Sequence, residues 1–277
     1  MDIDDLITLT NSFIVILDSR NANQYINGDY NSNVRFLFEQ GMYFPSNNIQ
    51  ITCSVLNFIC PNSIYIINET NNLLSLTINS VTTNYYITYG NYNATSFITY
   101  LLTVLPTGFT ISLNTINNIF TITYTTNFMI NSESSIYNVM GFKKNTNYTS
   151  SLFTLTLPYT CNFNGIQSIN ISLENINTYN LDSYNKSQTN IMQTINVDAN
   201  KTIIEFNKSE DYNITIKQSI MDYIDIGFTD NLQNFIDLNN QHWNLTLLFN
   251  IVSDKDRFAY HNSFLNILRN GKSIINN

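Results

Sequence analysis

The residues whose types suit acid–base or nucleophilic chemistry are few and widely spaced. Two histidines occur, His242 and His261, and no G-x-S-x-G sequence would place a nucleophilic serine on a strand-to-helix turn. His242 stands directly before the single tryptophan, Trp243, at the end of a polar segment. That position predicts an exposed turn histidine, so no Ser-His-Asp catalytic set is expected.

Motifs that bind charged ligands are present only as fragments. Asp222 and Asp225 lie in a predicted strand, and their odd spacing sends them to opposite faces. Asp254 and Asp256 share a side, but without further acidic ligands they indicate a solvated charge cluster rather than a calcium site. The Gly-Lys-Ser sequence at 271–273 matches the end of a phosphate-binding loop, yet the glycine required five residues earlier is an asparagine. We therefore expect no enzyme, and no catalytic, cofactor-binding or metal-binding residues are predicted.

The three cysteines, Cys53, Cys60 and Cys161, do not suggest a metal site or a disulfide framework. None has the CxxC spacing of a zinc site, and their number is odd. The pattern predicts buried free thiols in a reducing compartment.

The chain owes its polarity to amides and hydroxyls more than to charge. Its 277 residues include 48 asparagines, whereas charged residues make up only 12%. That share is about half of the usual one. The net charge is −8 and no basic stripe is present, so specific nucleic-acid binding and attraction to anionic membranes are not expected. Such a composition is typical of an AT-rich genome.

The N-terminal sequence does not predict export. Residues 1–10 are acidic and lack the basic segment that begins a signal peptide. No apolar run approaches the roughly 20 residues that a membrane helix needs, so no membrane insertion is expected. The chain is expected to be cytosolic or to be assembled in the cytosol.

The stretch from residue 221 to 252 shows most clearly the pattern that organises the chain. Apolar residues alternate in two runs, which predicts two strands that each bury one face. The first run is interrupted only by Asp222, and its apolar residues are Ile220, Ile224, Ile226 and Phe228. The second run consists of Trp243, Leu245, Leu247, Phe249 and Ile251. The polar connection at 229–242 predicts a hairpin that joins the two strands as a pair.

Similar runs lie on both sides of a middle segment of different character. Strands are predicted before Pro61 at 12–17, 34–38 and 49–60, and after Tyr159 at 169–173, 191–197, 203–206 and 212–216. The run at 12–17 is dense enough in β-formers to predict burial on both faces. Within 49–60, a bulge is expected before Phe58.

The middle segment carries the one convincing helix. Its apolar residues recur at three- and four-residue spacing, at Phe97, Ile98, Leu101, Leu102 and Leu105. Asn93, Thr95 or Ser96 can cap the start, and Pro106 with Gly108 ends it. Short strands are expected around this helix, at 64–67, 73–78, 85–88, 109–113, 119–124 and 152–157.

About eight strands outside the middle segment predict an all-β protein with a jelly-roll β-sandwich. The predicted organisation is an N-terminal arm at 1–9, a discontinuous jelly-roll domain at 10–60 and 159–253, an inserted smaller domain of α+β or β type at 61–158, and a C-terminal tail at 254–277. Two tandem jelly-roll or β-sandwich domains divided near residue 160 are compatible with the same pattern.

Several short phrases occur in an order that resembles the minor capsid (penton) proteins of virophages and Polinton-like viruses. The phrases are FPSNNI at 44–49, YGNY at 89–92 before the helix, VMGF at 139–142, INI at 169–171, LDS at 181–183, IDLN at 236–239 and WNLTL at 243–247. One departure is Met140, where that family tends to leucine. The likeness covers roughly residues 10–252.

The resemblance implies a viral structural protein rather than a catalyst. It implies a jelly roll with an insertion that assembles as a homopentamer at the vertices of an icosahedral capsid and contacts the major capsid protein. The protein would then reside in the virion after assembly in the host cytoplasm, with residues 1–10 and 253–277 as contact arms. No catalytic, cofactor or metal residues are carried over.

Two other interpretations remain open at the level of sequence. One is another shell component built of tandem jelly rolls. The other is a lectin-like attachment module that presents the tyrosine- and asparagine-rich loops. Oligomeric state separates the shell interpretations from the binding module, because a vertex protein buries large subunit faces.

Overall fold

The computed structural model describes residues 11–26, 31–43, 49–176, 180–182, 187–199, 201–208, 213–216 and 220–253. The predicted arms at 1–9 and 254–277 lie outside these ranges, as do most of the FPSNNI phrase and His261. The chain divides into two compact units, one formed by Met1–Ser63 with Ser168–Asn277 and the other by Ile64–Gln167. The second unit therefore interrupts the first.

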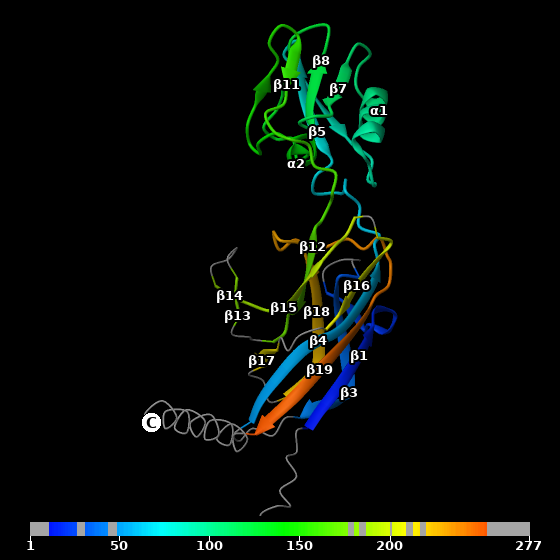
Figure 1. Ribbon diagram of the computed structural model, residues 1–277, viewed down its shortest axis with the longest axis vertical. Helices are drawn as coiled ribbons and strands as arrows, with labels where there is room; N and C mark the ends of the chain where they lie inside the picture. The colour runs from blue at the N-terminus through cyan, green and yellow to red at the C-terminus, as the bar shows by residue number, and fades with distance from the viewer. Residues whose placement is uncertain are drawn as a thin grey trace, which may run out of the picture. The chain divides into compact units, whose positions relative to one another are not determined.

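Two five-stranded antiparallel sheets form the body of the first unit, and both are drawn in Figure 1. The described residues of this unit also include a two-stranded sheet of β13 (Asn180–Asp182) and β14 (Ser187–Thr189). The first sheet has the order β1-β19-β4-β16, with β17 also paired to β4. Its strands are β1 (Asn11–Asp18), β19 (Asn244–Ser253), β4 (Ile49–Pro61), β16 (Ile203–Asn207) and β17 (Ile214–Ile216). The second sheet has the order β15-β12-β18-β3-β2. Its strands are β15 (Ile191–Asn196), β12 (Ser168–Leu173), β18 (Ile220–Thr229), β3 (Asn33–Tyr43) and β2 (Gln24–Tyr25).

The strand order is that of a jelly roll. When β1, β3, β4, β12, β15, β16, β18 and β19 are numbered 1 to 8 along the chain, the sheets read 1-8-3-6 and 5-4-7-2. Eight antiparallel strands split in this way between two sheets form two Greek keys. The predicted all-β jelly roll is therefore confirmed. The tandem alternative does not describe this arrangement, because β1 and β4 from before residue 160 both pair with β19.

The strands β18 and β19 are not the hairpin pair that their sequence suggested. β18 pairs with β3 and β12, whereas β19 pairs with β1 and β4 in the opposite sheet. The connection between them crosses from one sheet to the other and buries Ile236 and Leu238 on the way. Alternation of apolar residues in the sequence shows which face of a strand is buried. It does not show which strand is the hydrogen-bonding partner, because the backbone groups that pair are the same in nearly every residue.

The prediction that residues 12–17 are buried on both faces is wrong. Among the described residues, β1 pairs only with β19 and is therefore an edge strand. Val15 and Leu17 are buried, but Ile14 is 56% exposed and Ile16 is 76% exposed. The run of β-formers reflects strand propensity on both faces and burial on only one.

β-Bulges in two of the long strands change which side chains face the core. In β4, the pairing with β19 shifts between Thr246 and Leu247, which leaves Leu56 as the extra residue and confirms the bulge expected before Phe58. In β18, the register shifts between Met221 and Tyr223. This second bulge turns Asp222 outward and Met221 inward, so the charge that interrupted the apolar face lies in solvent.

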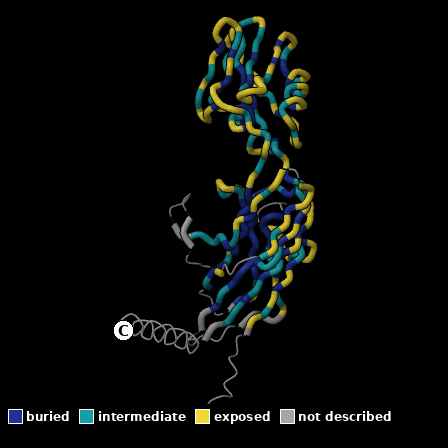
Figure 2. Tube along the Cα trace, in the orientation of Figure 1, coloured by how far each residue is buried: buried dark blue, intermediate teal, exposed yellow. Residues whose placement is uncertain are grey.

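The core of the jelly roll is centred on Trp243, which is fully buried, and Figure 2 shows in dark blue where the buried residues lie along the chain of this unit. Its ring makes edge contacts with Phe36 and Phe228, whose ring centroids lie 6.0 and 4.7 Å away. Phe58 from the other sheet packs edge-on against Phe228 at 5.1 Å. Trp243 Nε1 donates to the carbonyl of Asn31 at 2.7 Å, so the buried polar group is satisfied.

The inserted unit consists of short strands and two helices. One sheet has the order β10-β9-β5-β6 and the other β11-β8-β7. The elements are β5 (Leu73–Ile78), β6 (Val81–Tyr86), α1 (Ala94–Val104), β7 (Thr110–Asn114), β8 (Ile119–Thr123), β9 (Phe128–Ile130), α2 (Tyr137–Met140), β10 (Tyr148–Thr149) and β11 (Thr154–Thr156). The expected strand at 64–67 does not form, since only an isolated bridge joins Ile67 to Gly90. The strands β9 and β10 were not predicted, because they are only three and two residues long.

Local sequence signals account well for the helices of this unit. Asn93 caps α1 by accepting from Ser96 N, and Ser96 Oγ accepts in return from Asn93 N, which forms a capping box. The helix α2 ends at Gly141, which has φ +87°. A Cβ atom at Gly141 would lie 2.2 Å from the carbonyl oxygen of Tyr159, so only glycine fits there.

Candidate functional site

Three residues that the sequence analysis weighed for chemistry, His242, Asp222 and Asp225, lie within the described ranges. His242 is exposed, as predicted, and its Nδ1 lies 3.2 Å from Ser19 Oγ. Asp222 is exposed, whereas Asp225 is buried on the same strand. In the part of the chain that the structure describes, no three His, Cys, Asp or Glu side chains gather in a way that could hold a metal ion. That part also contains no helix with the length and apolar character needed to cross a membrane.

The cysteines are free thiols, and two of the three are buried as predicted. Cys53 and Cys60 lie inside the jelly roll, while Cys161 is half-buried in the inserted unit. Burial raises the pKa of Cys60 to about 12 and raises the pKa of Cys53 further, since the thiolate would lose its solvation. Because the thiolate is the nucleophilic form, neither buried thiol is suited to catalysis.

The outer face of the second sheet carries a buried ion pair. Arg35 on β3 donates from Nε and Nη2 to the two carboxylate oxygens of Asp225 on β18, both at 2.7 Å. Asp225 is 5% exposed. The guanidinium also lies 4.1 Å from the ring centroid of Tyr223, and Asn175 binds the backbone of β18 on both sides of Ile224. The ion pair joins β3 to β18 through charge-assisted hydrogen bonds, and Asn175 joins the segment after β12 to β18.

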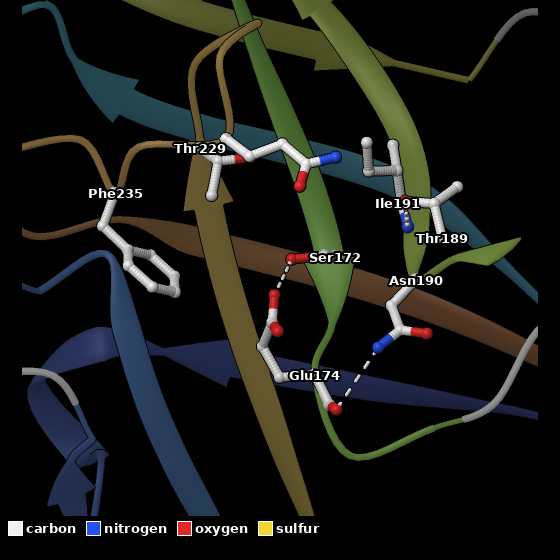
Figure 3. Close-up of a pocket in the computed structure, with 8 residues that line it drawn as sticks. Ser172, Glu174, Thr189, Asn190, Ile191, Thr229 and Phe235 are labelled. Atoms are coloured by element: carbon white, nitrogen blue, oxygen red, sulfur yellow. Dashed lines mark hydrogen bonds between the residues drawn. The ribbon is translucent and has the colours of Figure 1, made fainter. Parts of the chain in front are cut away.

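A pocket of about 220 Å³ opens beside this ion pair, on the same unit. Figure 3 shows its lining, which comes from the end of β12, the start of β15 and the loop after β18. The lining residues are Ser172, Glu174, Thr189, Asn190, Ile191, Thr229, Gln233 and Phe235. Glu174 is the one charged residue among these eight, so the pocket is polar and weakly acidic.

The carboxylate of Glu174 lies across the strand β18 at Gly227. Ser172 Oγ donates a hydrogen bond to Glu174 Oε1, drawn as a dashed line in Figure 3. A Cβ atom at position 227 would lie 2.5 Å from that same oxygen and 2.7 Å from Ser172 Oγ. The glycine in the middle of a strand is therefore explained by the close approach of a carboxylate.

Hydrogen bonds within residues 229–235, which follow β18, fix the loop at the edge of the pocket. Asp230 Oδ1 accepts from the backbone N–H groups of Leu232 and Asn234 at 2.8 and 2.9 Å. Thr229 and Phe235 close the loop as an antiparallel bridge. Gln233 adopts φ +62° inside this loop, and both Gln233 and Phe235 line the pocket.

The β1 edge of the first sheet carries exposed apolar side chains, and none of the described strands pairs with it on its outer side. Ile14 and Ile16 project from the outer face of β1, and the half-buried Leu248 of β19 stands opposite Ile14. Natural edge strands are usually short, charged or covered, because an open edge invites pairing with another chain. The eight residues of β1 carry one charge, Asp18, at their very end. Asp18 is held by Arg20, whose hydrogen bonds lower the pKa of that carboxyl to about 2.

Comparison with known proteins finds similarity only among solved structures. No family model matches the chain, and no curated protein matches it. Among solved structures, the chain is similar to the mavirus penton protein, with 14% identity and a TM-score of 0.44 over 87% of this chain and the whole of that chain. At that identity and TM-score the likeness supports no argument about function.

Sequence reasoning missed both features of the jelly-roll unit that stand out here. The pocket combines residues that are far apart in the chain, and its signals were the lone glycine at 227 and the carboxylate that follows the strand 168–173. The apolar edge was not predicted, because the strand at 12–17 was expected to be buried on both faces. Of the resemblance phrases, IDLN and WNLTL fall on the crossing connection and on the segment from Trp243 into β19, and VMGF includes the end of α2.

Proposed function

We propose that this chain is a viral structural protein, a minor capsid (penton) protein whose copies form the pentameric vertices of an icosahedral capsid and contact the major capsid protein. A structural rather than catalytic role is part of the proposal, as are location in the virion and assembly in the host cytoplasm. Support comes from the jelly-roll strand order with an insertion between β4 and β12, together with the ordered phrases that resemble those of penton proteins.

The observation that carries the proposal is the β1 edge, which no other described strand covers, with its two exposed isoleucines. A strand of this length with Ile14 at 56% and Ile16 at 76% exposure is a liability in a monomer and a ready contact in an assembly. A closed ring of identical copies uses heterologous contacts, in which one surface of each copy meets a different surface of the next. The β1 edge supplies one of those two surfaces, with a second copy of this chain as its occupant.

The test is the solution mass of the purified chain, measured by light scattering or native mass spectrometry. We expect a species of five times the 31.9 kDa subunit. The substitution Ile16→Lys places a charge in the contact and should convert the pentamer to monomers. Ile116→Lys is the matched control, because Ile116 is 94% exposed in a turn of the inserted unit, and it should leave the pentamer intact.

Two results would contradict the proposal. A wild-type trimer would point to a different shell or attachment role. A pentamer that survives Ile16→Lys would show that the β1 edge is not the subunit contact.

A further inference from the structure

The pocket beside β12 has the size and lining of a site for a single sugar ring. An enclosed cavity of about 150 Å³ holds benzene. The pocket volume of about 220 Å³ therefore has room for one six-membered ring with its hydroxyl groups. An occupant of one ring implies that only the end residue of a longer glycan would enter.

The polar groups of the lining are of the kinds that bind hydroxyl groups. Pyranose hydroxyls both donate and accept hydrogen bonds, and the lining contains a carboxylate, two side-chain amides and two hydroxyls, those of Glu174, Asn190, Gln233, Thr189 and Thr229. Asn190 Nδ2 donates to the Glu174 carbonyl at 3.4 Å and Thr189 Oγ1 accepts from Ile191 N at 3.3 Å, so the carboxylate of Glu174 is the group that carries the argument. Glu174 Oε1 is occupied by Ser172, while Oε2 accepts no hydrogen bond from the described residues. A carboxylate oxygen in this position would accept a charge-assisted hydrogen bond from a ligand hydroxyl.

Apolar surface stands on two sides of these polar groups. Figure 3 shows the ring of Phe235 on one side of the pocket and Ile191 on the other, with Ser172 and Glu174 between them. Phe235 is only half-buried, so part of its ring is accessible. A few placed polar groups between apolar walls are typical of sites that orient a small ligand. The C–H faces of a pyranose ring would contact these walls.

The charge of the pocket selects among sugars. None of the eight lining residues is Lys, Arg or His, and Glu174 is negative. An anionic sugar would bring a second negative charge beside Glu174, and none of the described lining residues supplies a cation to offset it. We propose that this pocket binds the terminal residue of a glycan when that residue is a neutral pyranose, and that Glu174, held in place over Gly227, is the residue that accepts from its hydroxyls.

Binding at the pocket can be tested independently of the oligomeric state. It lies within the jelly-roll unit on the face of the second sheet, whereas the proposed subunit contact lies on the edge of the first. Failure of the pentamer test therefore leaves the sugar site untouched, and failure of the sugar test leaves the pentamer untouched.

The experiment is ligand-observed saturation-transfer NMR on the full chain with methyl glycosides. The probes are the methyl glycosides of glucose, galactose, mannose and N-acetylglucosamine, the four free sugars, and the methyl glycoside of N-acetylneuraminic acid as the anionic comparator. A site for one ring with about a dozen heavy atoms is expected to bind with a Kd on the order of 1–10 mM. At least one neutral methyl glycoside should saturate in that range and bind at least tenfold more tightly than the sialoside.

Two variants test the residues that carry the argument. Glu174→Gln keeps an acceptor for Ser172 but removes the charge, and Gly227→Ala places a methyl group where the carboxylate lies. Each is expected to weaken binding at least tenfold. Asp222→Asn removes an exposed carboxylate from the same strand and should leave the Kd within twofold. Glu174→Gln is nearly isosteric, so it reads out binding even if Gly227→Ala fails to fold.

Four outcomes would overturn the proposal. They are absence of saturation by every neutral methyl glycoside, tighter binding of the sialoside, an unchanged Kd in Glu174→Gln, and binding of free reducing sugars alone.

Discussion

The two units of this protein hold their strands in register by different means. The jelly-roll unit uses long strands, up to the 13 residues of β4, and corrects their register with bulges at Leu56 and Asp222. The inserted unit uses strands of two to six residues and tight turns. Among the described residues, all four glycines with positive φ lie in the inserted unit, at 90, 108, 141 and 165.

The difference shows that the interactions specifying each unit act over different separations in the sequence. In the inserted unit the decisive features are local: a capping box at Asn93, a left-handed Gly141, and hairpin turns. In the jelly-roll unit the decisive pairs are distant, since Asn11 faces Ile251 across β1 and β19. The first sheet can be completed only after the whole insertion has been synthesised, which is the signature of high contact order.

The largest effect on stability is expected from Trp243→Ala, which removes the fully buried side chain at the centre of the core between the two sheets. The loss of a fully buried aromatic ring, with its hydrogen bond to Asn31, should lower the free energy of unfolding by about 4 kcal/mol. Chemical denaturation followed by circular dichroism measures this, because the variant has lost the only tryptophan. Trp243→Phe keeps most of the ring and should cost less than half as much. An equal cost for both variants would mean that the indole hydrogen bond, and not the ring, holds the sheets.

Gly141→Ala attacks the inserted unit through its backbone. The new methyl group would meet the Tyr159 carbonyl oxygen at 2.2 Å with φ at +87°. We expect a cost of about 3 kcal/mol to the inserted unit. Tyrosine absorbance and circular dichroism should show the loss, while Trp243 fluorescence reports separately on the jelly roll.

The control for this variant is Gly90→Ala in the same unit. Gly90 has φ +159°, at the border of the extended region, and a Cβ atom there meets only ordinary contact with the Tyr92 ring at 3.6 Å. It should change stability by less than about 1 kcal/mol. If Gly141→Ala lowered the Trp243 transition as much as the tyrosine signal, the two units would unfold as one, contrary to the contrast drawn above.

Arg35→Met tests whether the jelly roll also depends on a side-chain pair between distant strands. The change leaves the Asp225 carboxylate buried without its partner, whereas Arg35 itself is 31% exposed at its side chain. We expect a loss of about 2 kcal/mol, at the low end for a broken buried pair because of that exposure. Denaturation followed by Trp243 fluorescence measures it. Asp222→Asn, on the solvent side of β18, should have no measurable effect, and a comparable loss there would refute a special role for the ion pair.

The smallest effect, and the one of opposite sign, is expected at a turn of the inserted unit. Leu152 and Phe153 both adopt positive φ, at +50° and +67°, between the bridged residues Ser151 and Thr154. Such turns favour Asn-Gly, so Leu152→Asn combined with Phe153→Gly should raise stability by about 1 kcal/mol.

Ile116→Asn is the control for the turn variant. It removes an equally exposed apolar side chain from a turn position without positive φ, and it should leave the thermal midpoint nearly unchanged. A turn variant that is less stable than the wild type would show that Phe153 contributes packing that outweighs its backbone strain.

Most of the individual elements could be predicted from the sequence. The range 73–78 coincides with β5, Asn93 caps α1, and the apolar residues of β19 from Trp243 to Phe249 are buried as their alternation indicates. The larger errors concern which strands are neighbours, while the missed or misplaced elements are short ones such as β9 and β10. β18 and β19 lie in opposite sheets, and β1 is an open edge instead of a doubly buried strand. The segment between the predicted strands at 169–173 and 191–197, where no strand was predicted, contains the strand pair β13 (Asn180–Asp182) and β14 (Ser187–Thr189).

What the sequence determined by itself is which side of each strand faces inward and where helices begin and end. Those properties depend on side-chain hydrophobicity and on caps that act over three or four residues. What only the tertiary structure decided is which strands are neighbours, which edge stays open, and that Glu174 comes to rest over Gly227 beside Phe235. Strand pairing is made by backbone groups that are the same in nearly every residue, so the choice of partner depends on how all the strands pack together.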